Sequence, residues 1–396
     1  MIVTALSVLA LGIWTYLLLG RGWFWRCRER DDAVPLVSEA RSQDSPIAWP
    51  DVVAIIPARD EADVIAESVG SLLRQDYPGR FSIVVVDDQS SDATAAAASA
   101  AASALGAAGR VHVIPGSNVP SGWTGKLWAV RQGLAAVEAG AEPPKFVLFT
   151  DADIVYAPQM LRRLVAIARS KDSILTSLMV KLRCESPAEH WLVPAFVFFF
   201  LKLYPFAWVN DLGRATAAAA GGSMLVQRKA LGLAGGLEAV RGSLIDDCAL
   251  AALMKRQGAI WLGLTENVRS LRAYPAFADF GRMVARSAFA ELRYSPLRLA
   301  VAVAGMGLIY LAPPTFALFA HGVPQLAGAL AWAMMGLSFT PTLRLYGRPI
   351  AGGLALPAIA AAYILFTLES AVQFWRGHGG HWKGRFQAPV REAAGG

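Results

Sequence analysis

Residues 52–92 read VVAIIPARDEADVIAESVGSLLRQDYPGRFSIVVVDDQSSD, and this stretch decides the fold class. Residues 52–57 and 81–86 are short, β-branched and almost continuously apolar, like strands that a parallel sheet buries on both faces. Residues 61–75 between them have the apolar spacing of a helix, and residues 93–106 predict a second, Ala-rich helix. Strand, helix, strand, helix is the beginning of a doubly wound α/β domain.

The series of strands continues with a weaker one at 111–115 and a firmer one at 145–150, which runs directly into Asp151. Ligands of open α/β sheets gather beyond the carboxyl ends of the strands, so the residues that follow each strand are candidates for function. No GxGxxG follows the first strand, which argues against a dinucleotide-binding domain. The polar strand ends are Arg59-Asp60-Glu61, Asp87-Asp88-Gln89-Ser90-Ser91-Asp92 and Asp151-Ala152-Asp153.

Asp151 and Asp153 stand one residue apart at a strand end and can direct both carboxylates at one divalent cation. Mg²⁺ or Mn²⁺ is the expected ion, because both bind through one or two carboxylates and complete their shells with water and substrate phosphates. Such an ion neutralises a diphosphate leaving group. A solvated acidic turn is the alternative, and the position after a buried strand and two other acidic loops disfavours it.

The loops after the first two strands predict a nucleotide site. Asp88 follows a purely apolar strand, where its carboxylate can accept hydrogen bonds from a base or a ribose. Arg59 and Glu61 stand where a base or ribose would lie, with surface ion pairing as the alternative. Ser91 or Asp92 is expected to cap the helix that follows.

Two further motifs lie later in the chain. Lys126 opens a predicted helix after a glycine-bearing loop and is expected either to attract phosphate or to be a simple surface lysine, and the spacing of a P-loop is missing. Asp246 and Asp247 begin another predicted helix, where their negative charges can interact favourably with the positive end of the helix dipole. A carboxylate pair beside a bound metal can also raise one pKa towards the range for proton abstraction. We predict Asp247 as the general base.

The composition indicates a membrane protein. Hydrophobic residues make up 55% of the 396-residue chain and charged residues only 17%, which is too apolar for a wholly soluble globule. The three cysteines are widely spaced, so a disulfide framework is excluded and a reducing compartment is favoured. The net charge of +7 is scattered or flanks apolar runs, which indicates membrane-surface charge rather than nucleic-acid binding.

The apolar runs divide the chain. The first run is about long enough to cross the hydrocarbon core and is followed by arginines, as in an anchor with a cytoplasmic flank. A cleaved signal peptide would carry its positive charge before the run. The expected organisation is an anchor at 1–21, a linker at 22–50, a cytoplasmic catalytic domain at 51–295 with an interfacial helix near 191–209, two or three transmembrane helices at 296–375, and a tail at 376–396.

Taken together, the motifs resemble glycosyltransferase family 2, the inverting enzymes with a GT-A fold. The resemblance implies a Rossmann-like mixed sheet flanked by helices, with transmembrane helices at both ends, and a nucleotide-sugar donor, a UDP-sugar in the first instance. Asp247, with Asp246 beside it, carries the base, and Asp151 and Asp153 hold the metal. The implied donor contacts are Pro57, Arg59, Glu61, Asp88, Lys126 and Asp151, and the implied acceptor region is Gly221, Gly222, Ser223 and Trp191.

A narrower resemblance concerns the acceptor. The layout of anchor, cytoplasmic domain and C-terminal helices looks like the ceramide-glucosyltransferase-like branch. Residues 123–129 and 282–286 look like the hopanoid-biosynthesis-associated glycosyltransferases of bacteria. This implies a hopanoid or sphingolipid-like acceptor, glycolipid biosynthesis and a multi-pass protein of the bacterial inner membrane. The QxxRW element of processive members is reduced to Arg286 in residues 283–287, which favours single transfer, with Arg286 as a phosphate partner.

Three other functions stay open at this point. A processive polysaccharide synthase would make products with many sugars. A nucleotidyltransferase shares the metal carboxylates and the α/β sheet but usually needs a glycine-rich phosphate loop, which is missing here. A catalytically silent membrane scaffold could keep a transferase-like sheet, although the intact acidic residues speak against it.

Overall fold

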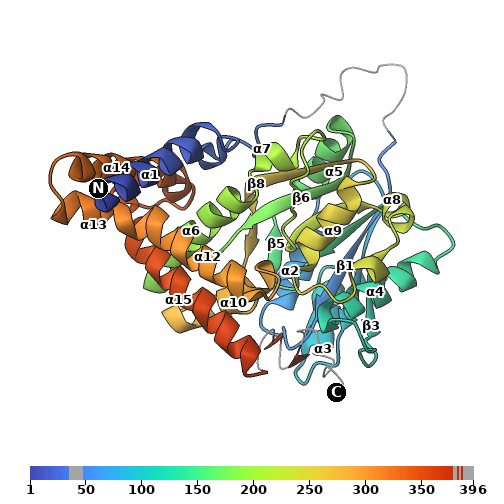
Figure 1. The fold of residues 1–396 in the computed structure, drawn as a ribbon. Helices are drawn as coiled ribbons and strands as arrows, with labels where there is room; N and C mark the ends of the chain where they lie inside the picture. The colour runs from blue at the N-terminus through green and yellow to red at the C-terminus, as the bar shows by residue number, and fades with distance from the viewer. Residues whose placement is uncertain (35–47, 378–380, 383–384, 387–396) are drawn as a thin grey trace, which may run out of the picture. The chain divides into compact units, whose positions relative to one another are not determined.

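A computed structural model describes residues 1–34, 48–377, 381–382 and 385–386, which form two compact units. The sheet unit consists of the described residues within Glu29–Leu182, Trp208–Arg272 and Trp382–Gly396. The helical unit consists of Met1–Arg28, Arg183–Ala207 and Ala273–His381. Figure 1 labels the elements of both units, and each unit is described by itself below.

The sheet unit contains one mixed, eight-stranded sheet. Its strands are β1 (Val52–Ala58), β2 (Phe81–Asp87), β3 (Val111–Pro115), β4 (Phe146–Thr150), β5 (Ile154–Tyr156), β6 (Ser173–Lys181), β7 (Ser223–Gln227) and β8 (Ala259–Ser270). They lie in the order β3-β2-β1-β4-β7-β6-β8-β5. The first four strands in this order are parallel, whereas β7 runs antiparallel to both of its neighbours and β5 antiparallel to β8. The expected mixed α/β sheet is confirmed.

Helices cover the sheet because its central strands are apolar on both faces. Ala54 and Ile56 of β1 belong to a buried core shared with helices α2, α3 and α5. Ile55 points to the opposite face, where a Cβ on Gly133 of α4 would come within 2.5 Å of it, so glycine lets this helix approach the strand closely. The helices of this unit are α2 (Ile65–Leu73), α3 (Thr94–Ala104), η3 (Ala108–Arg110), α4 (Gly125–Glu138), α5 (Met160–Ser170), α8 (Arg228–Leu233), η4 (Leu237–Val240) and α9 (Asp246–Lys255).

Part of the expected linker joins the sheet unit. The amide of Asp31 donates to the carbonyl of Leu264 in β8 at 3.0 Å, and the amide of Leu264 donates to Glu29 at 2.8 Å. The chain just after the first helix and its flank is therefore fixed to the sheet. Residues 35–47 of the linker, and the tail apart from residues 376–377, 381–382 and 385–386, lie outside the described residues.

The helical unit is assembled from three separate stretches of the chain. Its elements are α1 (Ile2–Leu19), η1 (Phe24–Arg26), α6 (Pro187–Leu203), α7 (Phe206–Val209, which extends into the sheet unit), α10 (Phe277–Ala285), α11 (Ala288–Glu291), α12 (Pro296–Met306), η5 (Gly307–Leu311), α13 (Ala312–Phe319), α14 (Val323–Leu345), η6 (Ile350–Ala355) and α15 (Leu356–Trp375). Trp14 of α1 donates to the carbonyl of Ile309 at 2.7 Å. In Figure 1, α1 lies beside α13 and α14.

Four helical segments among the described residues are long and apolar enough to cross a membrane: Ile2–Leu19, Pro296–Phe319, Val323–Leu345 and Ile350–Trp375. The aromatic stretch expected at 191–209 forms α6, which continues through Pro194. Ser186 and Glu189 close a capping box at the start of α6. The short α7 follows it.

Candidate active site

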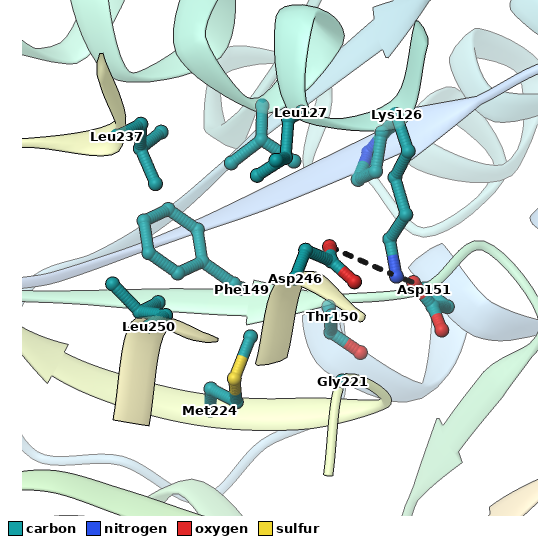
Figure 2. Close-up of a pocket in the computed structure, with 12 residues that line it drawn as sticks. Lys126, Leu127, Phe149, Thr150, Asp151, Gly221, Met224, Leu237, Asp246 and Leu250 are labelled. Carbon is teal, nitrogen blue, oxygen red and sulfur yellow. Dashed lines mark ion pairs between the residues drawn. The ribbon is translucent and has the colours of Figure 1, made fainter. Parts of the chain in front are cut away.

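A pocket opens at the carboxyl ends of β1 and β4, between the starts of α4 and α9 (Figure 2). Five residues singled out in the sequence lie in its wall, although they are spread over almost two hundred residues of chain. These are Pro57, Lys126, Asp151, Gly221 and Asp246. The remaining wall is mostly apolar: Leu127, Val130, Phe149, Thr150, Met224, Leu237 and Leu250.

Lys126 points from α4 into a group of carboxylates. Its Nζ lies 2.7 Å from Oδ1 of Asp151 and 3.8 Å from Oδ2 of Asp246, as the dashed lines of Figure 2 mark. Burial lowers the pKa of Lys126, but the charges of Asp151, Asp246 and Asp247 outweigh it and hold the pKa above its usual value. The side chain is therefore an ammonium ion at neutral pH that lies within this cluster, and the phosphate contact expected from the sequence stays a prediction.

Asp247 is held by backbone amides. Its Oδ2 accepts from the amide of Gly221 at 2.8 Å, and its Oδ1 accepts from the amide of Cys248 at 2.8 Å. Burial, followed by the charge of Asp246, raises the pKa of Asp247 to about 6, against the opposing effects of Lys126 and the two amides. A carboxyl group with such a pKa can accept a proton near neutral pH.

The glycine pair before β7 leaves room for this cluster. A Cβ on Gly221 would lie 3.3 Å from Oδ2 of Asp247 and 3.4 Å from Nζ of Lys126. The carbonyl of Gly222 accepts from Thr150 Oγ1 at 2.8 Å, which ties the glycine pair to the end of β4. Ser223 is buried at the start of β7. Gly221 therefore lies directly against the carboxylate of Asp247.

The loops after β1 and β2 are joined by hydrogen bonds. The guanidinium of Arg59 donates to the carbonyl of Asp88 at 2.6 Å. The amide of Glu61 donates to Thr94 Oγ1 at 2.8 Å. Asp92 accepts from the amide of Thr94 at 3.0 Å, but α3 begins at Thr94 with Ala93 as its N-cap and no side-chain cap, so the cap expected of Ser91 or Asp92 is not formed. Asp88 is fully buried, and the loops after β1 and β2 are held together by these hydrogen bonds.

Sequence reasoning missed Ser270 and Arg272, which lie at and just beyond the end of β8. Ser270 Oγ donates to Oδ2 of Asp153 at 2.6 Å. Arg272 Nη2 lies 2.6 Å from Oε1 of Glu61, and its Nε lies 3.7 Å from Oδ2 of Asp153. The guanidinium thus joins the loop after β1 to the Asp151-Ala152-Asp153 motif. The signal that could have found Arg272 is the one used for the other loops, a charged residue within two positions of the end of a strand.

The donor set around Asp151 suits a hard divalent cation. Its side chain is 34% exposed and already lies against one cation, the ammonium of Lys126. Asp153 is only 10% exposed, and its Oδ2 is engaged by Ser270 and Arg272. Among the described residues no three His, Cys, Asp or Glu side chains form a ready metal cluster. One or two carboxylates are sufficient for Mg²⁺ or Mn²⁺ when water and phosphate complete the shell, so the residues fit such an ion.

Two residues predicted for the site belong to the helical unit. Trp191 lies on α6 with its side chain largely exposed, and Arg286 follows the end of α10. The structure describes them separately from the pocket of the sheet unit, so their expected parts in acceptor and phosphate binding stay predictions.

The fold has counterparts among solved structures. A mannosyltransferase from Pyrobaculum calidifontis, solved with GDP-Man and Mn²⁺, superposes with a TM-score of 0.54 at 18% identity, covering 94% of this chain and 99% of that one. Glucosyl-3-phosphoglycerate synthase from Mycobacterium tuberculosis, solved with UDP, gives a TM-score of 0.39 at 21% identity over 59% of this chain and 76% of that one. The first similarity shows the shared GT-A fold.

Sequence comparison finds relatives as well. An N-acetylglucosaminyltransferase from Mesorhizobium japonicum is 28% identical over 145 residues, which is 36% of this chain. The match spans 31% of that relative's length. The family profile described as glycosyltransferase-like family 2 matches residues 50–262, more than half of the chain and the whole of the pocket described above. The chain belongs to glycosyltransferase family 2.

Proposed function

We propose that this glycosyltransferase moves one sugar from a nucleotide-sugar donor, a UDP-sugar in the first instance, to a hydroxyl group of a membrane lipid, with inversion at the sugar. The observation that carries the proposal is the pocket in which Lys126, Asp151 and Asp246 meet at the strand ends. It combines a phosphate-attracting cation with carboxylates in a family of sugar transferases.

The donor's phosphates have a natural place at the start of α4. Thr124 caps this helix, and the free amides of a helix N-terminus, together with the Lys126 ammonium, attract phosphate. Pro57 lines the same pocket, and Arg59, Glu61 and Asp88 shape the nucleotide loops. A divalent cation, Mg²⁺ or Mn²⁺, held by Asp151 and by Asp153 Oδ1, would neutralise the charge that develops on the departing nucleoside diphosphate.

Asp247 takes the proton from the acceptor hydroxyl, which then attacks the anomeric carbon. The two amides that hold the carboxylate fix its direction, and each oxygen keeps a further lone pair for the hydroxyl proton. Because the nucleoside diphosphate leaves as the hydroxyl attacks, a single displacement inverts the configuration of the sugar. Asp246, one residue earlier, keeps the pKa of this base high.

The acceptor is proposed to be a lipid because four described helices are long and apolar enough for a membrane. Gly221, Gly222 and Ser223 would border the acceptor hydroxyl, and the Trp191 region and Arg286 would contact its head group. The motifs at 123–129 and 282–286 support a hopanoid or sphingolipid-like acceptor. We place the chain in a bacterial inner membrane, with residues 1–21 and 296–375 as membrane segments and 51–295 in the cytoplasm.

The test is to reconstitute the full chain in lipid nanodiscs and to measure nucleoside diphosphate release from a panel of nucleotide-sugars, with and without Mn²⁺ and a bacterial lipid extract. We expect release from one donor that requires both Mn²⁺ and lipid extract. Release from no donor would support the silent scaffold, and a nucleotide-containing product would support a nucleotidyltransferase.

Arg272 provides a first prediction for this activity. Replacing it with Gln removes the guanidinium that joins Glu61 to Asp153, and loss of a cation beside poorly exposed carboxylates is unfavourable. Because Arg272 acts through those two residues, we expect kcat/KM to fall about 10–100-fold, mainly through the donor KM. Steady-state kinetics check this.

Two matched variants make the Arg272 result specific. Arg272→Lys keeps the cation but not the two-pronged geometry, so it should retain more activity than Arg272→Gln. Arg80→Gln removes an exposed guanidinium that pairs with Asp51 and Glu142, and it should act like the wild type. Equal donor KM values in Arg272→Gln and Arg80→Gln would show that Arg272 has no part in the site.

The pH dependence follows from Asp247. Its pKa of about 6 lies above that of an ordinary carboxyl group, so the base becomes protonated as the pH falls through about 6 and activity is lost on the acid side. We expect kcat/KM to fall about tenfold per pH unit below that point and to be flat above it. Asp246→Asn removes a charge that raises this pKa, so the inflection should move to lower pH. An inflection that stays in place in Asp246→Asn would contradict the assignment.

A further inference from the structure

Lys126 occupies an unusual position for a residue expected to bind phosphate. Its ammonium lies 2.7 Å from Asp151, the open carboxylate of the proposed metal site, and 3.8 Å from Asp246 (Figure 2). Gly221 has no side chain, and both the Lys126 ammonium and the Asp247 carboxylate lie beside the space that a Cβ would fill there. The ammonium of Lys126 is therefore shared by Asp151, which follows β4, and Asp246, which begins α9.

The same position is unfavourable for a second cation. A divalent ion that binds Asp151 must share this carboxylate with an ammonium ion or displace it, and the two cations repel each other strongly at such short distances. The side chain of Lys126 is 22% exposed, so solvent screens only part of this repulsion. The ammonium of Lys126 thus occupies a position next to Asp151 that a divalent ion would need.

A nucleoside diphosphate changes this balance. Lys126 is the second residue of α4, and phosphates at the start of this helix would accept hydrogen bonds from its flexible side chain. A lysine drawn to phosphate releases Asp151, and the released carboxylate becomes available to the metal. By linkage, the metal must then favour the diphosphate to the same degree.

We propose that Lys126 is a built-in counter-ion of the metal site, which resists divalent metal until a nucleoside diphosphate draws its ammonium away from Asp151. The inference rests on the proposed function, because it assigns the metal to Asp151 and the phosphates to the start of α4. The inference adds a coupling between the two ligands: the metal ion is bound tightly only together with the donor.

The experiment measures two affinities separately with the purified full chain. The first is the affinity for Mn²⁺ alone, from the electron paramagnetic resonance signal of free Mn²⁺ in the absence of nucleotide. The second is the affinity for UDP, measured calorimetrically in buffer that contains a chelator and no divalent metal. Wild type, Lys126→Met and Lys126→Arg are compared.

The counter-ion role predicts shifts of opposite sign. Lys126→Met should bind Mn²⁺ alone at least tenfold more tightly than the wild type and should bind UDP at least tenfold more weakly. Lys126→Arg keeps the charge and should leave Mn²⁺ binding weak. Lys181→Met removes another lysine that pairs with a carboxylate, Glu266 at 2.9 Å, and should change neither affinity.

The outcomes separate the inference from the proposed function. A Lys126→Met protein that binds Mn²⁺ as weakly as the wild type, or more weakly, while the wild type binds both ligands, overturns the counter-ion role alone. Circular dichroism shows whether Lys126→Met is folded. A folded Lys126→Met protein that binds both ligands more weakly overturns the role. If Lys126→Met does not fold, a Lys126→Arg protein that binds Mn²⁺ alone at least tenfold more tightly than the wild type overturns it instead. A wild type that binds neither UDP nor Mn²⁺, even when both are present together, overturns both proposals.

Discussion

Asp247→Asn is expected to lower kcat by about 10²–10⁴-fold, the usual contribution of a general base, while the affinity for the nucleotide donor stays close to that of the wild type. The substitution keeps the shape of the side chain but removes its ability to accept a proton. Donor affinity should be preserved because Asp247 does not line the pocket wall, whereas Lys126 and Asp151 do. Single-turnover kinetics and calorimetric binding of UDP measure the two effects separately.

Asp246→Asn is the matched control, because it also replaces a carboxylate by a carboxamide, at the neighbouring residue. Asp246 faces the pocket and lies 3.8 Å from Lys126, whereas both oxygens of Asp247 are held by amides. If Asp247 is the base, its replacement costs more in kcat than that of Asp246. The reverse order would transfer the role of base to Asp246 and leave Asp247 as the residue that positions it.

Asp151→Asn is expected to reduce kcat/KM by about 10³-fold, because the loss of a metal ligand removes several kcal/mol of charge stabilisation from the departing diphosphate. Added Mn²⁺ should not restore the activity. The variant should also lose most of its binding of Mn²⁺ in the presence of UDP. Electron paramagnetic resonance of free Mn²⁺ checks the binding, and steady-state kinetics over a range of Mn²⁺ concentrations checks the activity.

Asp211→Asn serves as the control for Asp151→Asn, since Asp211 is an exposed carboxylate that pairs with Arg214. It should behave as the wild type. An Asp151→Asn protein that keeps the Mn²⁺ dependence of the wild type would show that the ion is held elsewhere, and the metal site proposed at this strand end would then be wrong.

The first half of the sheet could be predicted because its strands carry their own signal. Residues 52–57 and 81–86 are continuous apolar runs, and they form β1 and β2 with one extra residue each. The predicted helices were too long at their ends: residues 61–75 contain α2 only from Ile65 to Leu73, because the chain first makes a turn after β1. The polar loops at the strand ends followed directly from these strands.

The second half of the sheet carries a weaker signal. β6 (Ser173–Lys181) and β8 (Ala259–Ser270) contain serine, threonine and charged residues, and β7 is short and runs antiparallel between two neighbours. Their order depends on pairings between distant segments, which local periodicity does not record. The mixed character of the sheet was expected from the family resemblance rather than from these segments.

The candidate site shows the same division. Asp151, Lys126 and the Asp246-Asp247 pair each follow or open a recognisable element, so their types and positions could be predicted. The contacts between them could not, since Lys126 meets Asp246 across more than a hundred residues of sequence. Arg272 reaches Glu61 over 211 residues, through the register of β8 in the sheet. Such long-range pairs depend on the assembled fold alone.

The central claim is that one sugar is transferred to a membrane lipid, and the mass of the lipid product tests it most directly. The full chain in nanodiscs would be incubated with its donor, Mn²⁺ and lipid extract, and the extracted lipids would be analysed by mass spectrometry. The account predicts a new lipid heavier by one sugar residue, present with the wild type and lost in Asp247→Asn. A ladder of products with many sugars, or donor consumption without any glycosylated lipid, would contradict it.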